Sequence, residues 1–522
     1  MEYKYQLLQS TGIVMFFTII SKVLGFGREM TIAAYFGATG DTDAYLVALS
    51  VPGILIAALG AAISTVLIPI FTQAYAKDAE QFQDVFNNFL TVLVIGFSML
   101  FCIAQPLAPY LVRIMAPGFN QEMLGKATYL TRLMLPSIIF MGLSSLYSAA
   151  LNSMQNFAVP SMVGLPYNVI IILSSVLLGK TYGITALAIG TVAAIVSQAV
   201  LQDIALHRRK VRYKPKLDWG SLELKMAAHL VLPVFLSSAV YQINTIVDKQ
   251  MASMLTEGSI SALSFANKLT MLPFGLFVGS LLTVLYPGLA ETAMKEDWAG
   301  FRERLILGVK NIVIWVTPMM VGLIVLREPI VRVLFERKAF DAAATQMTAY
   351  AVIFYAVGLP FLSLNNLLKR GFWSLQDTKT PMIVGIVTVC SNIALNFVFV
   401  RFMAHGGLAL ATSLSVLIGT IVLLVCMFKR VNTIDMASTI PFVFKCTLAS
   451  LLMGLLCNNL MTLLAGKVAL PEVIRLGIVV VLAGVTYVFM LMILRVREVR
   501  QLFNLKVVEK LWFTSVSNDQ NE

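Results

Sequence analysis

The sequence predicts an all-α, polytopic membrane protein. Of its 522 residues, 58% are hydrophobic and 13% are charged, and the mean hydropathy is +0.83. A water-soluble domain averages about 25% charged residues, so this chain has roughly half of what a wet surface needs. The apolar residues also fall in long runs, as membrane-spanning helices require. Together these observations exclude a secreted enzyme, a soluble nucleic-acid binder and a disordered scaffold.

The apolar runs predict about fourteen membrane-spanning helices. Roughly 20 mostly apolar residues cross the hydrocarbon, and charges, Gly and Pro bound the runs that are long enough. In chain order the runs are approximately 11–36, 43–74, 87–115, 127–152, 159–179, 183–206, 227–255, 262–294, 305–327, 346–368, 381–403, 407–429, 439–464 and 471–495. Because the number is even, both termini are expected on one side of the membrane.

The distribution of Lys and Arg predicts the orientation. Cytoplasmic loops carry an excess of these residues, and the loops on the side of the N-terminus hold most of them, including the cluster from Arg208 to Lys225. Both termini are therefore predicted to be cytoplasmic. The cytoplasmic excess of Lys and Arg accounts for the net charge of +12, so this charge does not indicate nucleic-acid binding. The basic 207–225 stretch is most simply a topology anchor that can also touch anionic lipid.

Residues that carry chemistry are scarce. The five cysteines are odd in number and lie scattered in apolar runs without metal-ligand spacing. The chain has neither a P-loop motif nor a constellation of acid, base and nucleophile. We therefore expect no enzyme activity and no cofactor. Without a P-loop the chain does not use ATP directly, so if it transports a substrate uphill, the energy would come from an ion gradient or the membrane potential.

An internal duplication organises the chain. Ser153–Pro160 (SMQNFAVP) matches Ser374–Pro381 (SLQDTKTP) at an offset of 221, and the same offset pairs Gly37 with Gly258. The unit contains six helices, so both copies insert the same way up, and transporters bind substrate between such halves. The architecture is thus two six-helix repeats plus two C-terminal helices, and alternating access by rocking lobes is the natural hypothesis.

This repeat predicts five parts. They are a six-helix N-terminal lobe at 1–206, a basic cytoplasmic linker at 207–226, a six-helix C-terminal lobe at 227–430, two extra helices at 431–495 and a cytoplasmic tail at 496–522. The two extra helices either pack as lipid-facing spans or form a groove for the lipid part of an amphiphilic substrate.

The first span contains two cations. Ionisable groups within a span are costly unless they face water, protein or substrate, so each is a candidate site residue. Lys22 lies near mid-depth. Arg28 and Glu29 follow a Gly-Phe-Gly segment, where two glycines favour a bend and exposed amides would favour an anion. The alternative for both cations is snorkelling to the interface, with Glu29 as the partner of Arg28.

Three more ionisable residues are candidates. Asp43 follows two polar residues at the start of the second span, so it is either a functional acid or part of a cap on that helix. In the second lobe, Lys249 occupies the repeat position of Arg28, with snorkelling as its alternative, and Lys268 lies about two turns into the eighth span. A cavity holding Lys22, Arg28 and Lys268 would suit an anion such as phosphate or pyrophosphate.

Several of these residues lie in motifs that resemble a known family. The runs 21–29 (SKVLGFGRE), 33–38 (AAYFGA) and 42–45 (TDAY) closely resemble the opening of the MurJ (MviN) family, which are lipid II flippases of the MOP exporter superfamily. The runs 266–273 (ANKLTMLP) and 376–381 (QDTKTP) are similar to that family too. The likeness covers the whole chain, including the fourteen helices.

The resemblance implies translocation of the undecaprenyl-pyrophosphate-linked peptidoglycan precursor from the inner to the outer leaflet of the bacterial inner membrane. The residues that match the family's cavity are Lys22, Arg28, Asp43 and Lys268. The last two helices resemble a pair that holds the polyprenyl tail, and Asp248 and Asp377 are the acids expected for the sodium site of some members. The expected partners are the lipid-linked substrate, membrane lipids and cell-wall synthesis proteins, with no nucleic acid.

The chain also departs from the family pattern. Residues 53–60 carry no charge where many members have an Arg pair and a Glu, and lysine replaces the usual arginine at positions 22 and 268, which gives up the planar bidentate fork. Three alternatives stay open. They are a flippase for another lipid-linked glycan, a cation-coupled exporter of small compounds, and a scaffold that recruits cell-wall enzymes through its basic loop and tail.

Overall fold

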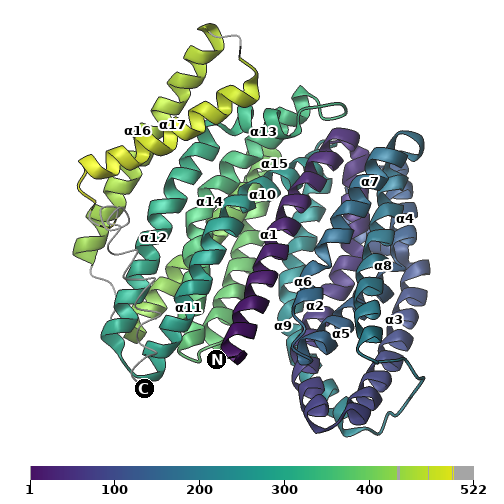
Figure 1. Cartoon of the computed structure of the whole chain (residues 1–522). Helices are drawn as coiled ribbons and strands as arrows, with labels where there is room; N and C mark the ends of the chain where they lie inside the picture. Colours follow the sequence, from purple (N-terminus) through teal and green to yellow (C-terminus); the bar gives the residue numbers. More distant parts are fainter. Residues whose placement is uncertain (1, 432–435, 468–469, 497, 499–522) are drawn as a thin grey trace. The chain divides into compact units, whose positions relative to one another are not determined.

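The structure is a computed structural model that describes residues 2–431, 436–467, 470–496 and 498. Helices account for all its regular secondary structure within these residues (Figure 1). They are α1 (Glu2–Phe36), α2 (Gly40–Lys77), α3 (Ala79–Met115), α4 (Gln121–Met134), α5 (Ser137–Ser153), α6 (Ala158–Met162), α7 (Gly164–Tyr182), α8 (Ile184–Arg208), α9 (Leu222–Ser253), α10 (Ser259–Pro273), the π-helix η1 (Phe274–Val278), α11 (Gly279–Met294), α12 (Trp298–Val325), α13 (Arg327–Phe335), α14 (Ala342–Ser374), α15 (Lys379–Val431), α16 (Met436–Lys467) and α17 (Glu472–Ile493). Except for Val496 and Glu498, the predicted tail 496–522 lies outside the described residues.

The predicted all-α membrane architecture is confirmed, and each predicted apolar run overlaps one to three consecutive helices. Ten helices in the described part are long and apolar enough to cross a membrane, or eleven if α4 and α5, bent by 41°, form one span. Two predicted runs fall on α15, whose backbone leaves the helical region at Ala404. The count of fourteen spans stays a prediction.

Side-chain caps set the starts of several helices. A helix begins with backbone N–H groups that have no partner within the helix, and Ser, Thr, Asp or Asn accepts one of them. Such caps precede α2, α3, α4, α9 and α12, at Thr39, Asp78, Asn120, Ser221 and Asp297. Prolines lie inside α2, α3, α12 and α14 without ending them, as is common in membrane helices, where other groups satisfy the freed backbone.

The backbone supports the internal repeat. Three pairs of residues with positive φ are separated by the offset of 221 found in the sequence. They are Gly37 with Gly258, Gln155 with Gln376, and Gly183 with Ala404. In the last pair both angles agree, at φ 56° and ψ −141° for Gly183 and φ 47° and ψ −131° for Ala404. Since positive φ is uncommon outside glycine, equivalent turns at one offset indicate that the two halves share a fold.

Contacts divide the chain into two compact units, each described here by itself. The first unit comprises Met1–Phe265, Phe335–Met347 and Asn396–Leu408. Within it α2 is central, because it packs against α3, α4, α5, α8 and α9, while α1 packs against α6 and α7. Phe71 on α2 meets the rings of Phe82, Phe86 and Phe89 on α3, so aromatic contacts hold these two helices together.

The second unit comprises Ala266–Leu334, Thr348–Leu395 and Ala409–Glu522. Here α16 packs between α12 and α17, and buried side chains of these helices, including Cys446 and Cys457, form one apolar cluster. The Tyr487 hydroxyl on α17 donates to the Ile314 carbonyl on α12 at 2.8 Å. The two extra C-terminal helices are thus fixed to α12 on one side, while α17 leaves large apolar side chains such as Val481 and Phe489 exposed.

The units group residues by contact, whereas the predicted parts come from the repeat. The predicted boundaries at 206, 226, 430 and 495 therefore stay a prediction. The expected bend near Gly25 and Gly27 does not interrupt α1, which runs as one helix through both glycines.

The repeat predicts the effect of a substitution at Ala404. A non-glycine residue in its region of φ and ψ is strained by about 1–3 kcal/mol, whereas glycine adopts it freely but loses more chain entropy on folding. We expect Ala404→Gly to stabilise the protein by about 1 kcal/mol, and the reciprocal Gly183→Ala to destabilise it by a similar amount. Thermal denaturation in detergent, followed by fluorescence, measures both. A lower melting temperature for Ala404→Gly would contradict the equivalence of these turns.

Candidate functional site

Arg28 is held in a defined orientation on α1. Its guanidinium forms an ion pair with Glu29 at 2.5 Å, and its Nη1 donates to the Asn168 amide oxygen on α7 at 3.0 Å. The same group lies 5.2 Å from the ring centroid of Tyr167, within the range of a cation–π contact. The Arg28 side chain is 21% exposed and that of Glu29 is 5% exposed. The pairing expected for snorkelling is present, and α7 adds two contacts that orient the cation.

Asn168 also fixes the spacing of α1 and α7. Its amide nitrogen donates to the Ser21 carbonyl at 3.0 Å, and a Cβ added at Gly25 would lie 3.6 Å from that nitrogen. Small residues therefore let α7 approach the part of α1 that carries the two cations. Lys22 lies next to Ser21, with an exposed side chain, about 9 Å along the helix from Arg28 at 1.5 Å per residue.

Asp43 is buried, with 2% of its surface exposed, and it caps a helix other than its own. Its Oδ2 accepts the N–H of Gly258 and its Oδ1 accepts the N–H of Ser261, both at 2.7 Å. Gly258 directly precedes α10 and Ser261 lies in its first turn, and the N-terminus of a helix attracts negative charge. The cap of α2 itself is Thr39, so the alternative in which Asp43 is the cap of its own helix is wrong.

Lys249 also connects two helices. The ammonium group on α9 donates to the Leu46 carbonyl on α2 at 2.6 Å and to the Ser50 hydroxyl one turn further along. The side chain is half-buried. Snorkelling would direct the ammonium group to the membrane interface. Here Lys249 instead donates to a backbone carbonyl of the first repeat.

Further contacts join the two repeats at the same end of the first unit. The Gly118 N–H donates to the Ser253 hydroxyl at 3.1 Å, and the Gln250 amide donates to the Ile114 carbonyl at 2.7 Å. The Ala339 N–H donates to the Ala34 carbonyl at 3.0 Å. Gly118 and Ala339 are again 221 residues apart, so each repeat places the same loop position against the end of the other repeat's first helix. We call these contacts, together with those of Asp43 and Lys249, the seam.

The two candidate sodium ligands have different surroundings. Asp248 on α9 accepts from the amide of Asn396 at 2.7 Å and from that of Asn244 at 3.3 Å. Asp377 accepts the N–H of Thr380 at 2.9 Å and its hydroxyl at 2.7 Å, and these hydrogen bonds hold the pKa of Asp377 below its ordinary value. Those contacts make Asp377 a cap on the first turn of α15. The described residues contain no cluster of three or more His, Cys, Asp or Glu that could hold a metal.

The structure therefore places five predicted site residues in the first unit and two in the second. Lys22 and Arg28 share α1. Asp43 and Lys249 belong to the seam, and Asp248 precedes Lys249 on α9. Lys268 and Asp377 belong to the second unit, where Lys268 lies half-buried on α10.

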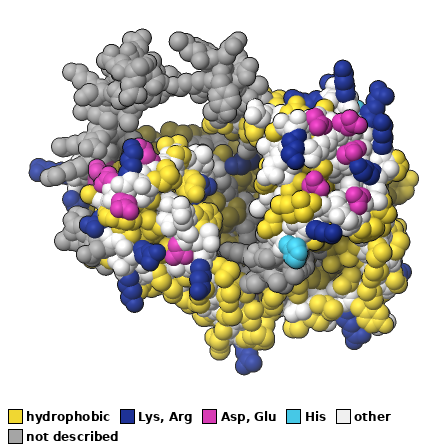
Figure 2. Space-filling model, turned by 90° about the horizontal axis from the view of Figure 1, so that it is seen from below, with side chains coloured by type: hydrophobic (Ala, Val, Ile, Leu, Met, Phe, Trp, Pro, Cys, Tyr) yellow, Lys and Arg dark blue, Asp and Glu magenta, His cyan; other side chains and the backbone are white. Residues whose placement is uncertain are grey.

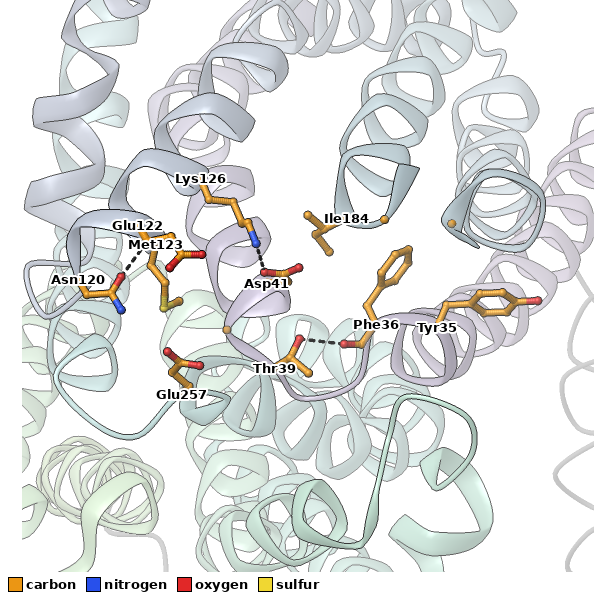
Figure 3. A pocket seen from close by; sticks show the side chains of 13 residues that line it. Tyr35, Phe36, Thr39, Asp41, Asn120, Glu122, Met123, Lys126, Ile184 and Glu257 are labelled. Atoms are coloured by element: carbon orange, nitrogen blue, oxygen red, sulfur yellow. Dashed lines mark hydrogen bonds and ion pairs between the residues drawn. The ribbon is translucent and has the colours of Figure 1, made fainter. Parts of the chain in front are cut away.

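A pocket of about 560 Å³ opens beside the seam (Figure 3). Its ionisable lining residues include Asp41, Glu122, Lys126 and Glu257, and Figure 3 shows the Lys126 ammonium turned toward the Asp41 carboxylate, with which it forms an ion pair. The lining is thus mainly acidic, opposite in sign to the predicted cationic cavity. None of the predicted site residues lines this pocket, so we do not assign an anionic substrate to it.

Sequence reasoning missed the neutral partners of the charged residues. Asn168 and Tyr167 orient Arg28, but neither is charged at neutral pH, so neither stands out among apolar residues as a charge does. A signal was present, because an amide in an apolar run needs a hydrogen-bond partner there. Gly258 was found through the repeat, but nothing in its spacing identified its N–H as a donor to Asp43.

Comparison with known sequences gives consistent matches over most of the chain. A family model described as lipid II flippase MurJ matches residues 32–473. A probable lipid II flippase MurJ of Vibrio cholerae is 31% identical over 424 residues, which cover 78% of this chain and 81% of that protein. The lipid II flippase MurJ of Burkholderia cenocepacia is 28% identical over 429 residues, with coverage of 79% and 82%.

Solved structures extend the likeness to three dimensions. A lipid II flippase MurJ in an inward closed conformation matches with a TM-score of 0.78 at 26% identity, covering 92% of this chain and 98% of that chain. A multidrug resistance MATE family transporter of the MOP superfamily, in an inward-facing conformation, matches with a TM-score of 0.69 at 13% identity. It covers 80% of this chain and 98% of its own, and this second likeness concerns the fold alone.

The seam predicts a difference between two neighbouring acids. Asp43→Asn replaces one acceptor oxygen by an NH2 group and leaves a buried N–H of α10 without its acceptor, which costs about 1–3 kcal/mol. We expect it to open the seam, and the measurement is the rate of crosslinking between cysteines introduced at Ile114 and Gln250, in a background whose native cysteines are replaced by alanine.

The matched control is Asp41→Asn. That side chain is 51% exposed and pairs with Lys126, and exposed pairs contribute about 0–1 kcal/mol. Crosslinking should therefore stay fast in Asp41→Asn and slow down in Asp43→Asn. Equal rates in the two variants would show that the buried carboxylate does not hold the seam.

Proposed function

The chain belongs to the lipid II flippase family MurJ, and from this premise we propose that it moves lipid II from the inner to the outer leaflet of the bacterial inner membrane. It is a multi-span membrane protein whose fold is that of MOP-superfamily transporters. Its substrate combines a polyprenyl tail with a pyrophosphate and a glycan headgroup. The chain acts as a transporter without catalysing a reaction.

The oriented guanidinium of Arg28 is the observation that carries this proposal. Glu29 and Asn168 engage three of its N–H groups, and a guanidinium has five. The remaining donors suit the oxygens of a pyrophosphate, which guanidinium groups bind through charge-assisted hydrogen bonds. We propose that Lys22, on the same helix as Arg28, binds this group as a point charge, and that Lys268 of the second unit is a further substrate-binding cation. Tyr167 and Asn168 keep the Arg28 side chain from searching other rotamers, which lowers the entropic cost of binding.

The seam provides the element that must open during transport. We propose that it closes the outer side and that the substrate enters from the inner side, with both chain termini cytoplasmic. Opening then requires Asp43 to leave the first turn of α10 and Lys249 to leave α2. A released Lys249 ammonium adds a cation that can follow the pyrophosphate outward. Each of these contacts is lost only when the repeats separate, as a two-state element in alternating access requires.

The tail of the substrate needs a different surface. We propose that the exposed apolar face of α16 and α17 holds the polyprenyl chain. Exposed side chains such as Leu455, Val481 and Val485 support this assignment, because a hydrocarbon chain gains by packing against an apolar surface. Cell-wall synthesis proteins are the expected partners that supply or consume the substrate.

Substitution of the two cations tests the proposal. Arg28→Ala and Lys268→Ala each remove a charge-assisted contact worth about 1.5–3 kcal/mol, so transport is expected to fall about tenfold to a hundredfold. The measurement is growth rescue in bacteria depleted of their own lipid II flippase, with immunoblots of the membrane fraction. Both variants should reach the membrane and fail to restore growth.

Two controls separate binding from folding. Lys77→Ala removes an exposed cation at the end of α2 and should rescue growth fully. Arg28→Lys retains the charge without the planar fork, so partial rescue is expected if charge and geometry both matter. Full rescue by Arg28→Ala together with full rescue by Lys268→Ala would refute pyrophosphate binding by these residues.

We propose that Asp248 couples transport to sodium. Its carboxylate is a hard ligand, which alkali and alkaline-earth cations prefer, and the amides of Asn244 and Asn396, which donate to it here, would turn their oxygens toward the bound cation. Asp377 stays a prediction for the same role, and coupling to the membrane potential remains the other source of energy.

Sodium should stabilise the purified protein through Asp248. A ligand present at ten times its Kd adds about 1.4 kcal/mol of stability, so NaCl should raise the melting temperature above that in equal KCl. Asp248→Asn should abolish this difference, and Asp377→Asn serves as the comparison. An equal response of the wild-type chain to the two salts would exclude a sodium site under these conditions.

A further inference from the structure

The segment between α8 and α9 is an ordered strap laid along α3. We define the strap as residues 209–221, the teal connection between these helices in Figure 1. Its N–H groups at Arg212 and Lys214 donate to the side-chain oxygens of Gln83 and Asn87 on α3, at 3.0 and 3.1 Å. An extended chain presents every second N–H on one side, so alternate strap residues face α3.

Asn88 holds the returning half of the strap. Its amide oxygen accepts the Asp218 N–H at 2.8 Å, and its amide nitrogen donates to the Asp218 carbonyl and to the Ser221 hydroxyl, each at 3.0 Å. Asn87 and Asn88 are 2% and 4% exposed. Buried amides with these contacts are costly to leave unsatisfied, so the strap has a fixed register on α3.

The outer side of the strap is basic. Five of its residues are Lys or Arg and one is Asp. Two of the cations have partners in the protein, because Lys216 pairs with Asp84 at 2.7 Å and Arg209 donates to the Met154 carbonyl. Lys210, Arg212 and Lys214 are exposed, as is Arg208 at the end of α8. Figure 2 shows that Lys and Arg side chains lie among acidic, other polar and hydrophobic side chains on the face that it views.

Apolar and aromatic side chains lie among these cations. Tyr213, Leu217 and Trp219 are 47%, 50% and 61% exposed. The strap follows α8 and lies on α3, both of which qualify as membrane spans, so it lies near the membrane boundary. Tyr and Trp favour this interface, and cations there are attracted to anionic headgroups.

We propose that the strap, with Arg208, is a preordered binding surface for anionic phospholipid headgroups. A disordered basic loop would attract anionic lipid through its charge alone. Here the hydrogen bonds from Gln83, Asn87 and Asn88 on α3 hold the strap backbone in place, so its cations have defined positions. Trp219 and Leu217 insert at the level of the acyl boundary, while Arg208, Lys210, Arg212 and Lys214 contact phosphates. The linker between the repeats thereby anchors the first unit to one leaflet and gives the rocking halves a fixed reference.

Trp219 provides the probe. The full chain is placed in nanodiscs of phosphatidylcholine and phosphatidylglycerol, with one lipid or the other brominated, because bromine quenches a tryptophan that it contacts. The Trp219 signal is the difference between the chain and its Trp219→Phe variant. We expect brominated phosphatidylglycerol to quench with about a tenfold preference at low salt, since each cation near the surface adds attraction, and the preference should shrink as salt rises.

Three variants decide the origin of the preference. The joint substitution Arg208→Gln, Lys210→Gln, Arg212→Gln and Lys214→Gln should abolish it. Asn88→Ala leaves every charge in place and should weaken it severalfold, because the strap loses its register. The matched control Lys295→Gln with Lys379→Gln removes exposed cations of the second unit and should leave the preference unchanged.

Other outcomes would overturn the proposal. Equal quenching by the two brominated lipids, or an unchanged preference in the fourfold variant, would exclude headgroup binding by the strap. Loss of the preference on addition of inorganic phosphate, at constant ionic strength, would identify a site for small anions instead. An unchanged preference in Asn88→Ala would show that charge alone acts and that the ordered register has no part.

Discussion

The hydrogen bonds between Asp43 and the first turn of α10 are the interaction on which the seam depends. A buried carboxylate needs donors, and a helix begins with N–H groups that lack acceptors within the helix. Asp43 on α2 accepts the Gly258 and Ser261 N–H groups. The carboxylate and the N–H groups thereby each avoid the free-energy cost of being buried without a hydrogen-bond partner. Because these helices come from different repeats, the bond joins the two repeats at the seam.

The same reasoning explains how charged groups persist among apolar helices. Arg28 has Glu29, Asn168 and Tyr167 as partners, and Lys249 donates to a backbone carbonyl of α2. An ionisable group in a span is tolerated when it has such contacts. Arg28 is oriented by side chains of α1 and α7, whereas Lys249 bonds to α2 at the seam. The two cations therefore differ in their surroundings, although they occupy equivalent positions in the two repeats.

Much of the fold could be predicted because its signals are local. Apolar runs predicted the positions of the helices, and the repeated motif around Gln155 and Gln376 predicted an equivalence that the backbone angles bear out. The tertiary partners could not be predicted. The sequence left Asp43 as either a functional acid or part of a cap on α2, but its donors lie more than 200 residues away in sequence. The basic linker gave no sign of its hydrogen bonds to α3, because neutral Gln and Asn side chains form them.

A chain that carries a pyrophosphate-linked lipid across the bilayer must speed the movement of that lipid between leaflets. The most direct measurement is the movement of fluorescently labelled lipid II between leaflets of vesicles that contain the purified chain, beside an undecaprenyl-monophosphate sugar as the comparison lipid. The account predicts that lipid II crosses much faster than in protein-free vesicles and that the monophosphate lipid gains little. Lipid II crossing no faster with the protein than without it would contradict the account.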